Sequence, residues 1–249
     1  MKHRIIPTLL TDGNTIIKGT AFDNWRTVGS LSASANLFAS RDVDELILFD
    51  VKSRTRKSEI KGSIIETFAA VLRVPFSFGG GIDNLDDASK ILESGAERVI
   101  LGTSAYQNPG LIYKIANKFG TQAVSVTVDI FDEDSLYFTI NSGLEIIKEN
   151  GLSFAKKVTE LGAGEIILQS VKRDGTLNGM AVELIRLFSS SLQVPIVASC
   201  GAGRVHDFAS AIKSGASAVA AGAVFQFTEI TPNVVREHLK SIGLQVRET

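Results

Sequence analysis

Two stretches of the chain carry the same pattern of apolar runs and glycines, one in each half of the sequence. The first is Pro75–Tyr106, PFSFGGGIDNLDDASKILESGAERVILGTSAY, and the second is Pro195–Phe227, PIVASCGAGRVHDFASAIKSGASAVAAGAVFQF. The two prolines lie 120 positions apart, and so do glycine pairs such as Gly81 and Gly201. A fixed separation of nearly half the chain indicates that the protein is built from two similar halves.

Eight short apolar runs recur along the chain, with stretches of helical spacing between them. Nearly continuous apolar runs are typical of parallel strands that are covered on both faces. The alternation therefore predicts an α/β fold, a (β/α)8 TIM barrel with an internal two-fold half-barrel repeat, as a single domain over residues 1–249. An open doubly wound sheet is the alternative, but closure lets two equal halves complete each other. The predicted strands are Arg4–Leu10, Glu45–Phe49, Pro75–Phe78, Arg98–Leu101, Ala123–Val128, Glu165–Leu168, Val194–Ala198 and Ala216–Ala220.

Charge and cysteine content exclude several classes of function. The 26 basic and 27 acidic residues give a net charge of −1, which argues against a nucleic-acid-coating or polybasic membrane-binding protein. Cys200 is the single cysteine, so the chain has no intrachain disulfide and no cysteine-rich metal site. The apolar run near the start is too short to span a membrane. We expect a cytoplasmic protein without a metal or cofactor.

Two connections are longer than a barrel of this kind needs. Asn14–Ser30 and Val51–Ser58 follow the first and second strands and are predicted as polar loops on the carboxyl-end face, where barrel active sites are built. The second loop is either a solvated surface loop or a cover for substrate. Asp132–Ile140 predicts a small hairpin after the fifth strand. The basic residues of the second loop are Lys52, Arg54, Arg56 and Lys57.

Glycine-rich turns follow the third, fourth, sixth, seventh and eighth strands, with the sequences FGGGI, LGTSA, RDGTLNG, SCGAG and AAGAV. Glycine lets backbone N–H groups approach a ligand closely, and barrels often hold a phosphate after the last two strands. The repeat adds a matched pair of turns after the third and fourth strands. We therefore expect a ligand with two phosphates, held on opposite sides of the barrel mouth. The alternative is that these glycines only make tight turns.

Asp129 is the strongest candidate for acid/base chemistry, because it ends the apolar fifth strand at the active face of a barrel. Desolvation there could raise its pKa into a useful range. Its repeat partner, 119–120 positions earlier, is Leu10 or Leu9, neither of which is an acid. Other acids near the mouth are Asp12, Asp50 and Asp174.

The remaining candidates are weaker. Lys18 either reaches a phosphate or holds the first loop, while Cys200 lacks a neighbouring base in the sequence and is disfavoured as a nucleophile. Trp25 and Met180 are predicted to be packing residues. No role is assigned to the three histidines, which lack metal-ligand spacing: His3, His206 and His238.

Four charged residues lie at or near the beginnings of the first, second, fourth and sixth strands. They should meet as a ring of alternating charge at the amino-end face of the barrel. The ring is either a stabilising salt-bridge plug or a gate across the barrel axis. Its members are Arg4, Glu45, Arg98 and Glu165.

Motifs spread in order along essentially the whole chain resemble the cyclase subunit of imidazole glycerol phosphate synthase. They include KGTAF, VDEL, FGGGI, GTSAYQNP, FGTQAVSVTVD, GAGEIIL, RDGT, ASCGAG and VFQF. The resemblance implies a (β/α)8 barrel that receives ammonia from a class I glutaminase subunit docked at the amino-end face. With that ammonia the family cleaves and cyclises a two-phosphate ribulosyl formimino carboxamide ribonucleotide in histidine biosynthesis.

The resemblance also implies roles for individual residues. The charged ring would be the ammonia gate, and Asp129 would be one of the family's two catalytic aspartates. The phosphate sites would be Gly81, Gly102 and Thr103 on one side, and Asp174, Gly175, Gly201, Gly222 and Ala223 on the other.

Leu10 is the main departure from the family, because it takes the place of the first catalytic aspartate. In this respect the chain resembles a side branch of the family that is found in surface-polysaccharide gene clusters. There the barrel and its glutaminase supply ammonia to a separate amidotransferase, which acts on a nucleotide-linked acetamido sugar. The alternatives are a genuine histidine-pathway lyase that uses Asp12 or Asp50 instead, and a non-catalytic scaffold that activates a glutaminase. The related aminoaldose isomerase fits the ring and the VFQF segment less well.

Overall fold

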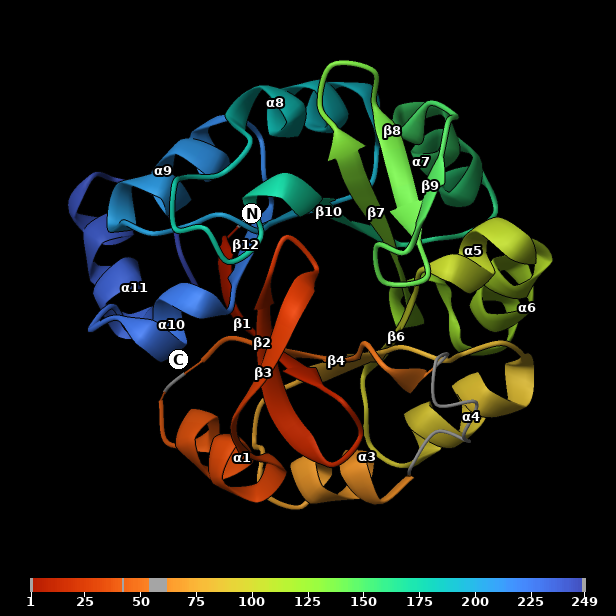
Figure 1. The fold of residues 1–249 in the computed structure, drawn as a ribbon, viewed down its shortest axis with the longest axis horizontal. Helices are drawn as coiled ribbons and strands as arrows, with labels where there is room; N and C mark the ends of the chain where they lie inside the picture. Colours follow the sequence, from red (N-terminus) through yellow and green to blue (C-terminus); the bar gives the residue numbers. More distant parts are fainter. Residues whose placement is uncertain (1, 42, 54–61, 248–249) are drawn as a thin grey trace.

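Eight parallel strands close into a barrel in the computed structural model, which describes residues 2–41, 43–53 and 62–247 (Figure 1). Their order around the barrel is β1-β4-β5-β6-β7-β10-β11-β12, and β12 pairs with β1. The predicted (β/α)8 barrel is therefore confirmed, and each of the predicted strands forms. The barrel strands are β1 (Arg4–Thr11), β4 (Leu46–Asp50), β5 (Phe76–Gly79), β6 (Arg98–Leu101), β7 (Val124–Asp132), β10 (Glu165–Ser170), β11 (Ile196–Ser199) and β12 (Ala218–Ala221).

Helices cover the outside of the barrel between successive strands (Figure 1). None of the described helices is long and apolar enough to cross a membrane. Short 3-10 helices lie at η1 (Thr121–Ala123) and η2 (Val171–Arg173). The α-helices are α1 (Leu31–Ala39), α3 (Gly62–Ala69), α4 (Leu85–Glu93), α5 (Thr103–Gln107), α6 (Gly110–Phe119), α7 (Gly151–Glu160), α8 (Val182–Ser191), α9 (Val205–Lys213), α10 (Ala223–Phe227) and α11 (Pro232–Ser241).

The connection Asn14–Ser30, predicted as a polar loop, is instead mainly an antiparallel ribbon. Strands β2 (Thr15–Thr20) and β3 (Asp23–Ser30) pair with each other, and β2 also pairs with the end of β1. The ribbon forms because Ile16 and Ile17 are buried, which a solvated loop could not achieve. In Figure 1 it lies across the barrel end that faces the viewer.

A second ribbon extends from the same end of the barrel. Strand β7 continues into β8 (Tyr137–Ile140) and β9 (Glu145–Ile147), so the predicted hairpin is confirmed and gains a third strand. Most of the basic loop after β4, including Arg54, Arg56 and Lys57, lies outside the described residues.

Side chains alternate between the inside and the outside of the barrel. On β1, Ile5 and Leu9 join the large core between strands and helices, whereas Ile6 faces the barrel interior. Thr8 and Leu10 share the parity of Ile6 and line the mouth. The interior holds a small apolar layer made of Ile6, Ile47, Ile100, Ile167, Val197, Ala218 and Ala220, with Phe49 packed against it.

A buried ion pair ties the last helix to the barrel. Arg236 of α11 donates to Asp44, just before β4, at 2.9 Å, and both side chains are at most 4% exposed. The other carboxylate oxygen of Asp44 accepts from the backbone N–H of Ile5 at 2.7 Å. One carboxylate therefore connects α11, β1 and the start of β4.

Asp44→Asn is expected to destabilise the fold by about 3–5 kcal/mol, because it removes a buried anionic partner of the Arg236 charge. The matched control is Glu183→Gln, which removes an exposed ion pair to Arg186 on α8 and should cost at most about 0.5 kcal/mol. Urea denaturation of both variants measures the difference. Equal, small losses would contradict a stabilising role for the buried pair.

Candidate functional site

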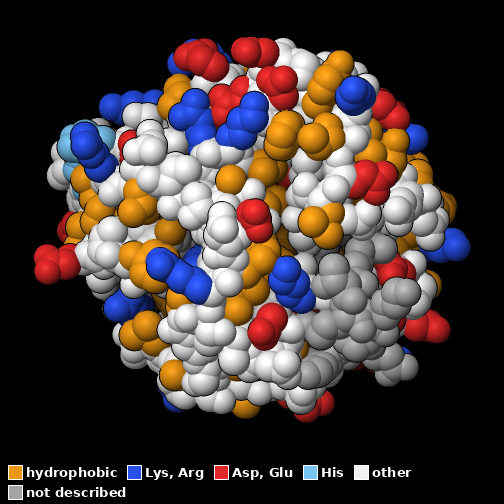
Figure 2. Space-filling view, viewed as in Figure 1, with side chains coloured by type: hydrophobic (Ala, Val, Ile, Leu, Met, Phe, Trp, Pro, Cys, Tyr) orange, Lys and Arg blue, Asp and Glu red, His pale blue; other side chains and the backbone are white. Residues whose placement is uncertain are grey.

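A cavity of about 120 Å³ opens at the carboxyl ends of the barrel strands. Figure 2 shows this face, with hydrophobic side chains at its centre among scattered acidic and basic ones. The structure brings together in the cavity lining the leading acid/base candidate and all the residues that the resemblance assigned to phosphate binding. They are Gly81, Gly102, Thr103, Asp129, Asp174, Gly175, Gly201, Gly222 and Ala223.

Asp129 lies near the end of β7 and faces the cavity. Gln169, beside it on β10, donates its Nε2–H to Asp129 Oδ1 at 2.9 Å. Burial raises the pKa of Asp129 to about 7, although the hydrogen bond from Gln169 opposes the shift. A carboxyl group with this pKa populates both protonation states at neutral pH, as a general acid or base requires.

Leu10 occupies the corresponding position on the opposite side of the barrel. Strands β1 and β7 are four steps apart in either direction around the closed sheet, and Leu10 lines the same cavity as Asp129. Ile6, Thr8 and Leu10 point inward on β1 as Ser125, Thr127 and Asp129 do on β7, a separation of 119 positions. Inward parity therefore selects Leu10, rather than Leu9, as the counterpart of Asp129.

The other acids near the mouth have different surroundings. Asp12 makes a turn, in which its Oδ1 accepts from the N–H groups of Asn14 and Thr15 at 2.8 Å, and it is not among the cavity residues. Asp50 and Asp174 do line the cavity, and Asp50 is 2% exposed. Burial raises the pKa of Asp174, against the opposing charge of Lys18.

Lys18 reaches into the cavity from the β2–β3 ribbon and is 5% exposed. Its Nζ donates to the carbonyl of Thr8 at 3.4 Å. A Cβ at Gly222 would lie 1.9 Å from the same Nζ, so only glycine leaves room for the ammonium group at this turn. Burial lowers the pKa of Lys18, and the Asp174 carboxylate opposes that shift. Both roles left open for Lys18 fit this geometry, because the ammonium group lines the cavity and also ties the ribbon to β1.

The two ribbons meet the barrel turns above the cavity. Ala21 N–H donates to the carbonyl of Asp174 at 2.9 Å, and Asn141 N–H donates to Thr103 Oγ1 at 2.8 Å. Trp25, predicted as a packing residue, lines the cavity, and Lys52 Nζ lies 5.5 Å from its ring centroid. The segment that carries Trp25 forms a strand over the mouth, so its ring lies at the cavity and also packs closely against Gly19. Met180 is buried in the core, as predicted.

Two further results concern residues to which the sequence gave little or no weight. Gln169 was missed, although it has the inward parity of Glu165 on β10 and could have been found from that spacing.

The histidines are distant in sequence, yet the ring centroids of His206 and His238 lie 4.6 Å apart between α9 and α11.

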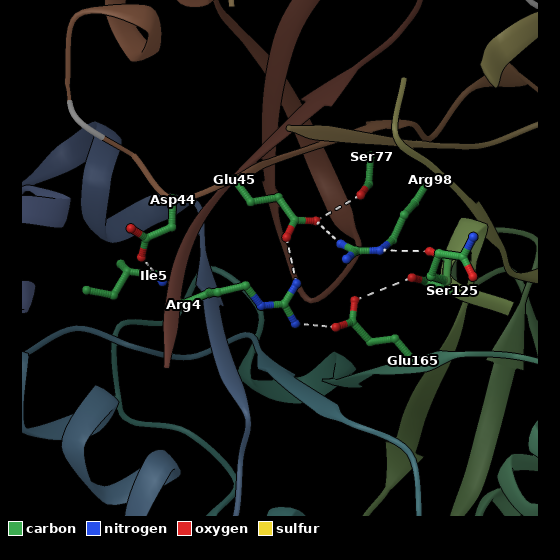
Figure 3. A network of polar contacts seen from close by, with 9 residues as sticks. Arg4, Ile5, Asp44, Glu45, Ser77, Arg98, Ser125 and Glu165 are labelled. Carbon is green, nitrogen blue, oxygen red and sulfur yellow. Dashed lines mark hydrogen bonds and ion pairs between the residues drawn. The ribbon is translucent and has the colours of Figure 1, made fainter. Parts of the chain in front are cut away.

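The predicted charged ring forms at the other end of the barrel (Figure 3). Arg4 donates to Glu45 at 2.6 Å and also to Glu165, while Arg98 donates to Glu45 at 2.7 Å. Serines support the acids: Ser77 donates to Glu45 at 2.9 Å and Ser125 to Glu165 at 3.4 Å. Among the described residues no ion pair joins Arg98 to Glu165, so the ring is open on one side.

Comparisons with known proteins agree with this architecture. A family model described as "Histidine biosynthesis protein" matches residues 4–231. The chain is 35% identical to the imidazole glycerol phosphate synthase subunit HisF of Thermobifida fusca, covering 98% of each chain. It is 36% identical to the HisF subunit of Endomicrobium trichonymphae, over 98% of this chain and 95% of the relative. It is also 36% identical to the HisF subunit of a Thermotoga species, over 99% of this chain and 98% of the relative. The chain therefore belongs to the histidine biosynthesis protein family, as a HisF-like cyclase subunit of imidazole glycerol phosphate synthase.

Proposed function

We propose that this chain accepts ammonia from a class I glutaminase docked at the amino-end face and conducts it to the mouth, which binds a phosphorylated substrate or effector. The observation that carries the proposal is the arrangement along one axis: a charged ring, an apolar layer, and a cavity lined by Asp129 and the glycine turns. Ammonia would enter through Arg4, Glu45, Arg98 and Glu165.

The barrel interior suits the passage of a small neutral molecule. Above the ring the interior side chains are mainly apolar, with Thr8 and Thr127 on the side of the mouth, and β12 contributes only Ala218 and Ala220 to that layer. Ammonia crosses such a layer at low cost as NH₃, whereas the ammonium ion would have to lose its hydration shell. The open side of the ring, between Arg98 and Glu165, is the natural point of entry.

The mouth suits an anionic ligand. The turns after β5, β6, β11 and β12 expose backbone near the cavity, and Lys18 supplies a buried positive charge beside Gly222. Matched turns in the two halves provide two sites across the mouth. A molecule with a phosphate at each end would satisfy both.

The acceptor reaction is the finer part of the proposal and rests on Leu10. A leucine cannot transfer a proton, and Asp12 is held in a turn away from the cavity. A missing acid or base typically costs about 10²–10⁴ in rate. We therefore place the ammonia-consuming step in amidation of a nucleotide-linked acetamido sugar for surface polysaccharide, carried out with a separate amidotransferase.

Histidine biosynthesis is the second candidate, and two observations favour it. The family model and the relatives carry histidine-pathway names, and Asp50 lines the cavity from β4, next to β1. In that case the chain itself would form imidazole glycerol phosphate and aminoimidazole carboxamide ribotide, with Asp50 in place of the missing aspartate.

Glutamine hydrolysis by the chain reconstituted with its class I glutaminase separates the candidates. Stimulation by a nucleotide-linked acetamido sugar, but not by the histidine-pathway bisphosphate, is the result we expect. The reverse pattern, together with growth of a histidine auxotroph that lacks its cyclase, would favour the second candidate. Tight association without stimulation by either ligand would leave only a scaffold role.

Lys18→Met is expected to weaken binding of inorganic phosphate by at least about tenfold, because a charge-assisted hydrogen bond contributes roughly 1.5–3 kcal/mol. Trp25 is the sole tryptophan and lines the cavity, so its fluorescence can report the titration. Lys213→Met, on the exposed face of α9, removes the same charge far from the mouth and is the control. Equal phosphate affinity in the two folded variants would contradict the site.

A further inference from the structure

Cys200 adopts a backbone conformation that favours glycine. Its φ is +75°, and its counterpart 120 positions earlier is Gly80, with a φ of +109°. The next positions in the two halves, Gly81 and Gly201, have φ values of +72° and +93°. Three of these four equivalent positions are glycine, so Cys200 is the exception within the molecule's own repeat. A side chain in this strained region requires a compensating contact, and such strain gathers at functional sites.

One contact of the side chain leads to Asp129. Cys200 Sγ lies 3.5 Å from Gln169 Oε1 and 3.9 Å from Ser199 Oγ, and the Nε2–H of the Gln169 amide donates to Asp129 Oδ1 at 2.9 Å. Cys200 and Gln169 are 7% and 8% exposed. Strand register places Gln169 between the other two residues. Gln169 on β10 lies beside Asp129 on β7 and beside Ser199 on β11, the residue that precedes Cys200.

We propose that Gln169 and Cys200 are positioning residues for Asp129: the thiol donates to the Gln169 oxygen and so holds the amide N–H toward the carboxylate. An amide can turn by 180° and exchange its oxygen and nitrogen, and a donor on the far side selects one of the two orientations. The inference deepens the proposed function, because it rests on the role given there to Asp129.

Other groups at the mouth face these residues. Asp174, Lys18 and Asp50 are the charged neighbours that line the cavity with Asp129, and Asp174 also interacts with the thiol. Burial raises the pKa of the Cys200 thiol, so Cys200 keeps its proton at neutral pH and can act as a donor. Asp174 and Ser199 are therefore competing acceptors for the thiol proton, and the test must separate them from Gln169.

The titration midpoint of the Asp129 carboxyl, measured by NMR of the full chain labelled at the aspartate side-chain carbonyl, tests the proposal. Asp129→Asn identifies the resonance. Gln169→Met keeps the length of the side chain without the amide, and it should raise the midpoint by about one pH unit because the charged form loses a hydrogen bond. Cys200→Gly should raise it by a smaller, resolvable amount, and Cys200→Ser should restore the wild-type value.

Cys200→Gly also keeps the test falsifiable, because glycine accepts the positive φ and the variant should fold at least as well as the wild type. An unchanged midpoint in folded Gln169→Met would overturn the role of Gln169. An unchanged midpoint in Cys200→Gly would overturn the role of Cys200 and leave Asp174 or Ser199 as the acceptor of the thiol proton. The readout is the carboxyl itself, so failure of the proposed ammonia chemistry would be seen separately, in activity assays.

Discussion

Leu10→Asp is expected to raise ammonia-dependent cyclisation of the histidine-pathway bisphosphate by about 10²–10⁴-fold, because it restores a proton-transferring group on the side of the mouth opposite Asp129. Leu10 lines the cavity from β1, and its inward parity matches that of Asp129 on β7. Formation of imidazole glycerol phosphate is measured with excess ammonium salt at pH 8 and without glutaminase, so the assay depends on the mouth alone.

The matched control for this change is Leu10→Asn, which has the shape and polarity of the aspartate but cannot exchange a proton. It should remain at the wild-type rate. If the aspartate and asparagine variants were equally slow, the deficit would lie somewhere other than in proton transfer at the end of β1.

Asp129→Asn, introduced into the Leu10→Asp background, should return the rate to the starting level, a loss of about 10²–10⁴-fold. The reason is that Asp129 is the group whose pKa, raised by burial to about 7, suits proton transfer at neutral pH. Cyclisation assays on the double variant measure this loss. A rate that survived the second substitution would assign the acid/base role to another side chain of the cavity, of which Asp50 and Asp174 are the candidates.

Asp129→Asn should lower the rate but raise the free energy of unfolding at alkaline pH, which distinguishes a chemical role of Asp129 from a structural one. The carboxyl pKa rises from 3.8 to about 7 on folding, so between these values the folded state binds more protons than the unfolded state. The stability contributed by Asp129 is therefore present below pH 3.8 and is lost as the pH rises through 7. The asparagine variant should match the wild type at pH 4 and exceed it by about 2–4 kcal/mol at pH 8.

The sequence was sufficient to predict the barrel, because parallel strands covered on both faces leave long apolar runs that the chain repeats in each half. It also placed the glycine turns at the mouth and the charged ring at the opposite end, since strand ends of one kind meet at one end of a barrel. Inward parity, applied to every strand, would have added Gln169 and resolved Leu9 from Leu10. The apolar runs and the inward parity can both be read from residue spacing alone.

The ribbons over the mouth were harder to predict. Thr15–Thr20 reads as a polar connection, but its strand pairs with β1, Ile16 joins the core and Ile17 is buried, which are tertiary contacts that local sequence does not encode. The positions of Trp25 and Lys18 depend on that ribbon, so their place in the cavity could not be derived from local sequence either. The contact of Cys200 could not be predicted from local sequence for the same reason, because Gln169 lies 31 residues away in the chain.

The central claim is that the mouth retains its grip on a doubly phosphorylated molecule while proton transfer at the end of β1 is lost. A single-turnover experiment tests it most directly: wild-type chain in excess over the histidine-pathway bisphosphate, with saturating ammonium salt and product formation followed over time. We expect the substrate to be bound, with quenching of Trp25 fluorescence, and to remain uncleaved on the timescale in which Leu10→Asp converts it. Conversion by the wild type within about tenfold of that rate, abolished by Asp50→Asn, would contradict the account.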